Sequence, residues 1–200
     1  MRPHDEDIAI QGGFDYAWDN GIYIGTWGSV VDFDLTSEDG LNGSLELDYY
    51  VGWSSDVGEN SAIDVGYLYY DYPGDSSVLE GDYQEIYGSF SFHDLTVGIH
   101  YSDDYYAESG TFFYYYADYS LGLGDTFSLD FHIGLNDFDD KDVFLSDGDS
   151  YVDYSVALSA SWLAVDWSVA WVGTDLDGGD YFELDDLVDD TIVFTVSKSM

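Results

Sequence analysis

Residues Phe127–Leu135 read Phe-Ser-Leu-Asp-Phe-His-Ile-Gly-Leu, and apolar and polar side chains alternate along this stretch without a break. Successive side chains of a β-strand point to opposite faces, so the stretch predicts a strand with one apolar face and one polar face. At about 3.3 Å per residue, a tilted strand of this length would cross most of the apolar core of a bilayer. A strand of a soluble sandwich alternates in the same way, so the rest of the chain must decide between the two.

The chain is strongly acidic. Its 200 residues include 42 Asp and Glu but only three Lys and Arg, which gives a formal net charge of -39. Three basic residues cannot neutralise the phosphates of a nucleic acid. We therefore expect cations, and not nucleic acid, as binding partners. The chain has no cysteine, which excludes disulfides, thiolate metal sites and a cysteine nucleophile. The length allows one all-β domain over residues 1–200.

Most of the chain repeats this alternation. We predict eleven strands, at residues 8–18, 21–33, 43–53, 61–71, 82–92, 95–102, 111–121, 126–136, 151–161, 164–173 and 190–198. Strands 21–33 and 82–92 alternate less cleanly than the others. With 19% aromatic residues and only two prolines, the composition favours aromatic strands joined by turns.

The predicted connections alternate between short turns and long, acid-rich loops. Asn20-Gly21 is a strong signal for a two-residue hairpin turn, and Leu163-Ala164 is equally short. Short turns at one end and long loops at the other are typical of outer-membrane barrels. Aromatic residues near the strand ends would then form interfacial girdles, and the candidates are Trp18, Tyr72, Tyr101, Tyr119, Trp162 and Trp171.

The fold class that we predict is an all-β, antiparallel, up-and-down transmembrane β-barrel. Bacterial single-chain barrels use even strand numbers. We therefore expect twelve strands in the complete protein, with the first strand and a signal peptide upstream of this sequence. The alternative is a soluble, halophile-like acidic β-barrel or sandwich whose apolar faces form an internal core. That alternative leaves the alternation of the loops unexplained.

Several segments resemble the TorF porin family, in the right order and over nearly the whole chain. They are Asp5–Tyr16, Gly21–Ser29, Asp64–Tyr67 with Tyr72–Gly74, Tyr101–Tyr105 and Val196–Ser199. The resemblance implies a β-barrel in the outer membrane of a Gram-negative bacterium that is expected to form a pore. It carries no catalytic residues. The acid excess is stronger than is usual for that family, which suggests a high-salt source.

If the apolar faces contact lipid, the polar faces line the lumen. We predict that the lumen is lined by Asp15, Glu46, Asp48, Asp64, Glu85, His100, Asp130, His132, Asp153 and Asp166. Rings of carboxylates attract cations and repel anions. The sequence therefore predicts passive diffusion of small solutes across the outer membrane, with a preference for cations. A barrel of this size can also be filled by its own side chains, so a non-conducting structural barrel is the alternative.

The sequence offers residues for two further kinds of site, a calcium site and a hydrolase site. Acidic residues cluster in two of the long loops, and they are weak candidates for loosely bound Ca²⁺, because hard cations prefer oxygen ligands. These candidates are Asp137, Asp139, Asp140, Asp142, Asp175, Asp177 and Asp180. The side chains of His100 and His132 fall on the polar faces of their predicted strands, as do those of Ser102 and Ser128. However, no Gly-x-Ser-x-Gly turn accompanies them. We therefore predict no enzymatic activity and no organic cofactor. The expected partners are the lipid bilayer and small solutes or cations.

Overall fold

The computed structural model describes residues 8–30, 45–73, 81–139, 145, 148–177 and 188–199. These residues form eleven β-strands and one short 3₁₀ turn, η1 (Tyr106–Glu108). The strands are β1 (Gln11–Ala17), β2 (Ile22–Val30), β3 (Leu45–Asp56), β4 (Ser61–Asp71), β5 (Tyr83–Phe92), β6 (Leu95–Ser102), β7 (Phe112–Leu123), β8 (Phe127–Phe138), β9 (Ser150–Trp162), β10 (Val165–Thr174) and β11 (Thr191–Ser197). In the described residues, no helix is long and apolar enough to cross a membrane.

The strands form one antiparallel sheet in the order β1 to β11, so the predicted up-and-down fold is confirmed. Some bounds differ from the prediction. Strand β3 continues to Asp56 and β8 to Phe138, because the pairs Asp56↔Ala62 and Phe138↔Phe112 extend their ladders. Short turns join the strands at one end of the sheet and long connections at the other, as the sequence predicted. We call these the short-turn end and the long-loop end.

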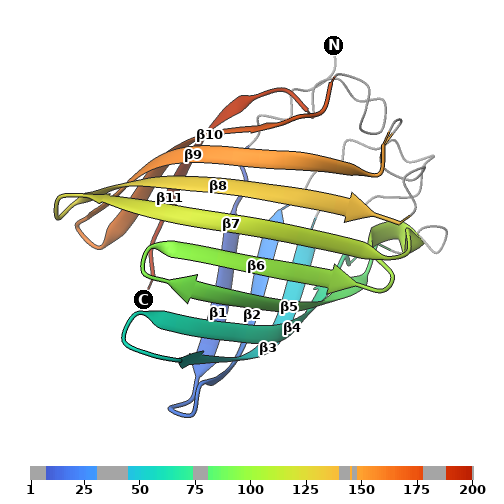
Figure 1. Ribbon diagram of the computed structural model, residues 1–200, viewed down its shortest axis with the longest axis horizontal. Coiled ribbons are helices and arrows are strands. Elements are labelled where there is room, and N and C mark those ends of the chain that lie inside the picture. Colours follow the sequence, from blue (N-terminus) through green and yellow to red (C-terminus); the bar gives the residue numbers. More distant parts are fainter. Residues whose placement is uncertain are drawn as a thin grey trace.

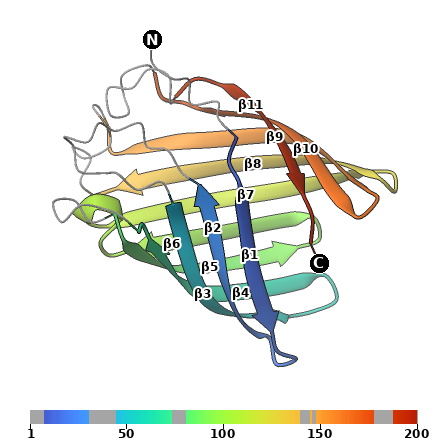
Figure 2. The same cartoon turned by 180° about the vertical axis from the view of Figure 1, so that it is seen from behind.

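The sheet curls round on itself. In Figure 1 the strands β6, β7 and β8 lie in front and β1 and β2 run behind them, and Figure 2 shows β1 and β2 from the other side. Strands β1 and β11 are the two edges of the sheet, and no ladder joins them in the described residues. The twelfth strand stays a prediction.

The cross-strand register divides the side chains of the sheet between two faces. One face, which we call the outer face, is almost entirely apolar and exposed, with Ile133 55% and Phe194 62% accessible. The acids on this face of the described strands are Asp71 and Asp137, both at the long-loop end. This arrangement is opposite to that of a soluble barrel, whose apolar side chains pack against each other inside.

The other face is concave, and we call it the inner face. Its side chains meet across strands that are not neighbours: the Tyr23 hydroxyl on β2 lies 2.5 Å from the Tyr87 hydroxyl on β5. Adjacent strands are about 4.8 Å apart, so strands three positions apart are separated by roughly 14 Å along the sheet. Two tyrosines can bridge that distance only if the sheet bends towards the face that carries them.

Candidate functional site

The inner face collects all the residues that the sequence predicted for the lumen. The register places them on one side of the sheet, distributed over the strands from β1 to β10. They are Asp15, Glu46, Asp48, Asp64, Glu85, His100, Asp130, His132, Asp153 and Asp166. Asp56 and Asp118 share this face, although the sequence analysis did not select them. Whether these residues line a conducting pore stays a prediction.

Several acids of the inner face are paired with tyrosines. The Tyr23 hydroxyl donates to Asp64 at 2.6 Å, and the Tyr72 hydroxyl donates to Glu46 at 2.5 Å. Tyr50 donates to Asp15, which lies two strands away. A phenol donor satisfies a carboxylate without adding positive charge, so the inner face keeps its negative charge. In the described strands, this face carries no Lys or Arg.

Glycines make room for these tyrosines. A Cβ atom at Gly52 would overlap the ring of Tyr23, and one at Gly66 would overlap the ring of Tyr87. Each of these tyrosines thus lies beside a glycine of the neighbouring strand, and the hydroxyl end of its ring occupies the space above the glycine. The same arrangement joins Gly25 to Tyr50, Gly98 to Tyr116 and Gly134 to Tyr114. Sequence reasoning interpreted these glycines only as relief of crowding and missed their tyrosine partners.

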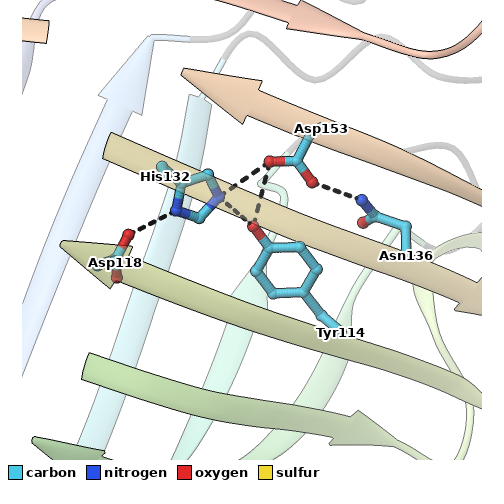
Figure 3. A network of polar contacts seen from close by, with 5 residues as sticks. All are labelled: Tyr114, Asp118, His132, Asn136 and Asp153. Carbon is cyan, nitrogen blue, oxygen red and sulfur yellow. Dashed lines mark hydrogen bonds and ion pairs between the residues drawn. The ribbon is translucent and has the colours of Figure 1, made fainter. Parts of the chain in front are cut away.

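His132 is the centre of the polar network drawn in Figure 3. Its Nδ1 lies 2.6 Å from Asp118 on β7, and its Nε2 lies 2.9 Å from Asp153 on β9. Tyr114 contacts the same Nε2 at 2.7 Å, and Asn136 donates to Asp153 at 2.8 Å. Through these contacts His132 links the three neighbouring strands β7, β8 and β9.

His100 forms a second, smaller contact of the same kind. Its Nδ1 lies 2.8 Å from Glu85, which is 4% accessible and also accepts from the Tyr70 hydroxyl at 3.3 Å. Asp48 is buried close by, and its Oδ1 has no hydrogen-bond partner among the described residues. Carboxylates are rarely buried without a basic partner, so Asp48 departs from what is usual in a protein interior.

Serine hydroxyls complete the inner face towards β10. Asp130 accepts from Ser120 at 2.6 Å and from Ser128 at 3.1 Å, and Asp166 accepts from Ser161 at 2.5 Å. Ser128, which the sequence analysis placed near the histidines, therefore points its hydroxyl at a carboxylate. These bonds place Ser128 in a structural pair rather than in a nucleophile–base pair.

Two cavities open on the inner face in its short-turn half. The first, about 390 Å³, is lined by tyrosine, histidine and acid side chains, including Tyr23, Asp64, Tyr87, His100 and Tyr116; we call it the tyrosine cavity. The second, about 400 Å³, lies over β8 to β11 and is lined by Phe127, Ala160 and Trp167 together with small polar residues that include Ser128, Ser159, Ser161, Asp166, Ser168 and Thr195; we call it the serine cavity. Volumes of this size suit small molecules.

The long-loop end of the inner face is filled instead. Phe112, Phe138 and Leu145 are each at most 5% accessible and pack together with tyrosines from the neighbouring connections. We define the aromatic cluster as Tyr70, Tyr72, Tyr83, Tyr105, Tyr106, Phe112, Phe138, Leu145 and Tyr151. The rings stack closely, with centroids 4.0 Å apart between Tyr105 and Phe112.

Tyr72 corrects one prediction. The sequence analysis assigned it to an interfacial girdle, but Tyr72 is 6% accessible and contacts Glu46 inside the sheet. The reason is its position in the strand. Tyr72 comes two residues after Tyr70, so the two point to the same side of the sheet, and Tyr70 pairs with Asp48 and Tyr83 on the inner face. Burial, together with the hydrogen bond to the Glu46 carboxylate, raises the pKa of Tyr72.

The predicted calcium ligands are only partly described. Asp140, Asp142 and Asp180 lie outside the described residues. The Asp175 carboxylate accepts from the backbone N–H of Val152 at 2.7 Å, which gives it a structural role. Within the described ranges, no group of three or more acids and histidines is arranged to hold a metal ion. The calcium site, which also included Asp137, Asp139 and Asp177, stays a prediction.

The structure is similar to a solved structure titled "NanC porin structure in rhombohedral crystal form", with a TM-score of 0.68 and 12% sequence identity. The match covers 96% of this chain and 93% of that chain. At this identity the likeness concerns the fold, so the chain shares the antiparallel, up-and-down strand arrangement of that porin.

The chain belongs to the family described as "Bacterial protein of unknown function (Gcw_chp)", whose model matches residues 3–200. A comparison with curated proteins gives no match. The family assignment agrees with the bacterial origin that the resemblance implied. The name TorF stays a prediction.

Proposed function

We propose that this protein is an outer-membrane channel through which small solutes diffuse passively, with a preference for cations. The observation that carries the proposal is the charge of the inner face: the described strands place acids there from β1 to β10 and no Lys or Arg. Carboxylates around a narrow passage favour cations and repel anions. The apolar outer face and the fold shared with a porin support a membrane location. No step in this function requires a reaction or a cofactor.

The first test is the conductance of the complete chain in planar bilayers under a gradient of potassium chloride. We expect discrete openings with a reversal potential on the cation-selective side. Asp48→Asn and Asp130→Asn together should move the reversal potential towards zero, because both acids lie on the inner face. The matched control is Asp71→Asn together with Asp137→Asn, which also removes two charges, but from the outer face, and should leave the selectivity unchanged.

One observation favours a second candidate, a structural barrel that does not conduct. The aromatic cluster buries Phe112, Phe138 and Leu145 at the long-loop end, where a solute would have to pass. A folded, membrane-inserted protein without any conductance would contradict the channel and support this candidate. The soluble acidic barrel makes a separate prediction, because such a protein would stay monodisperse without detergent.

A further inference from the structure

The tyrosine cavity has a composition that an inorganic cation pathway does not need. Its wall includes Tyr23 from β2, Tyr87 from β5 and Tyr116 from β7, together with the ring of His100. The rings of Tyr87 and His100 are stacked, with centroids 5.5 Å apart at an interplanar angle of 25°. His100 and Tyr116 follow at 5.9 Å. Aromatic rings from three parts of the sheet thus form one continuous wall.

The glycine pairs fix how these rings are presented. Tyr23 lies over Gly52, Tyr87 lies over Gly66, and the Tyr116 ring covers Gly98 in the same way. The hydroxyl end of each ring therefore lies against backbone. Because the same rings line the cavity, the ring surfaces that do not contact glycine are those that a bound molecule would contact. The π-face of an aromatic ring attracts a cation placed over it.

Asp64 supplies a charge at the same place. Its Oδ1 accepts the Tyr23 hydroxyl at 2.6 Å, and no hydrogen bond among the described residues uses its Oδ2. A carboxylate has about four lone-pair sites, so Asp64 can accept further hydrogen bonds from a ligand. The nearest base in the cavity wall is His100, and its Nδ1 is engaged by Glu85 at 2.8 Å.

We propose that the tyrosine cavity binds a small organic ammonium ion. Its N–H groups would donate to Asp64 and to the phenol oxygens of Tyr23 and Tyr87, and its carbon skeleton would lie against the tyrosine rings. A hard metal ion prefers oxygen ligands to the ring faces, and a neutral sugar would gain little from the carboxylate charge. The ammonium ion uses both. The proposal rests on the proposed function, because it names the class of solute for which the channel holds a site.

The test measures binding and not conduction. Cyclohexylammonium is titrated calorimetrically into the complete chain, folded in non-ionic detergent, with empty micelles as the blank. Cyclohexanol, which has the same shape without the charge, is the comparison ligand. We expect cyclohexylammonium to bind at least about tenfold more tightly than cyclohexanol, because only the cation gains the carboxylate and the ring faces.

Two pairs of variants locate the site. Asp64→Asn should weaken cyclohexylammonium binding about tenfold, whereas Asp94→Asn, in an exposed turn, removes the same charge and should change binding less than about twofold. Tyr116→Leu should weaken binding by several-fold, and Tyr116→Phe, which keeps the ring, should restore it. The Tyr116 pair remains informative if Asp64→Asn fails to fold.

Several outcomes would overturn the proposal: equal loss in Asp64→Asn and Asp94→Asn, equal binding of cyclohexanol and cyclohexylammonium, or preferential binding of a neutral sugar such as glucose. Binding without any conductance would leave the proposal standing and contradict the channel. Cation-selective conductance without cyclohexylammonium binding would support the channel and contradict the ammonium site.

Discussion

The two halves of the inner face differ in how they are filled. In the long-loop half, the aromatic cluster packs its rings at centroid distances such as 4.2 Å between Tyr70 and Tyr83, and Phe112 is only 4% accessible. In the short-turn half, the same face leaves two cavities of about 400 and 390 Å³ lined by serines, tyrosines and acids. A single alternating pattern therefore produces both a closed and an open region, depending on the size of the inward side chains.

If solutes pass along the inner face as proposed, the two halves would resist their passage differently. The inner-face acids occur in both halves, but the apolar rings are concentrated in one. We therefore expect the long-loop half to limit the size and rate of passage, and the short-turn half to hold the solute.

The largest effect is expected from emptying the aromatic cluster. Phe112→Ala removes a ring that contacts Tyr105 and Phe138, and the free energy of unfolding should fall by about 3–5 kcal/mol, as for other buried phenylalanines. The single-channel conductance should rise at the same time, because the long-loop half is opened. Urea titration in detergent and bilayer recording measure the two effects.

The matched control for this variant is the next residue along β7. Phe113 lies on the outer face, so Phe113→Ala should leave the conductance unchanged and cost less stability. Unchanged conductance in Phe112→Ala would show that the aromatic cluster does not restrict the passage.

The second prediction concerns the glycines that make room for the tyrosine rings. Gly98→Ala places a Cβ where the ring of Tyr116 now lies, and displacing that ring should cost about 1–3 kcal/mol of unfolding free energy. Gly88→Ala is the matched control, because its Cβ would make only an ordinary contact, 3.7 Å from Val65 on the outer face. It should be neutral or stabilise by up to about 1 kcal/mol. Equal effects of the two substitutions would contradict the role of the glycine pairs.

The sequence predicted the strands and their polarity well, for a physical reason. A face that contacts lipid must be apolar at every second residue, so the period is explicit in stretches such as Phe127–Leu135. Turns with strong local preferences, such as Asn20-Gly21, then separate the strands. The inner-face position of each predicted acid follows from the same period.

The contacts inside the sheet could not be predicted in this way. The contact between Tyr23 and Tyr87 depends on the register of four strands and on the curvature of the sheet. Neither property can be read from a short stretch of sequence. Phe112 and Phe138 occupy inward positions that the pattern assigned to polar residues, because the long-loop end is packed rather than open. Tyr72 was assigned by residue type when its parity would have placed it inside.

A third prediction uses alkaline pH to probe the closed half. Because burial raises the pKa of Tyr72, the folded protein holds the phenol neutral above its ordinary value of about 10, while the unfolded chain ionises. Stability should therefore be present below about pH 10 and be lost above it, by at most about 1.4 kcal/mol per pH unit for one group. Tyr72→Phe should lose less stability between pH 9 and 11, roughly by that amount. Identical pH profiles for the two proteins would place Tyr72 in contact with water.

The smallest effect is expected at the short-turn end, where local geometry alone should matter. Leu163 and Ala164, which join β9 to β10, both have φ of 57°, and a left-handed backbone costs a residue with a Cβ about 1 kcal/mol. Asn and Gly are the residues that this two-residue turn prefers. Replacing Leu163 with Asn and Ala164 with Gly should therefore raise the unfolding free energy by about 1 kcal/mol.

The conductance and ion selectivity of this double variant should equal those of the wild type, because the turn contributes no side chain to either described cavity. Gly21→Ala is the opposite change at the β1–β2 turn, where φ is 87° and the Ser54 carbonyl oxygen leaves no room for a Cβ. It should destabilise the protein by a similar or larger amount. If the double variant stabilises the protein and also changes its conductance, the short-turn end takes part in the passage, and the two halves of the inner face are less independent than their packing indicates.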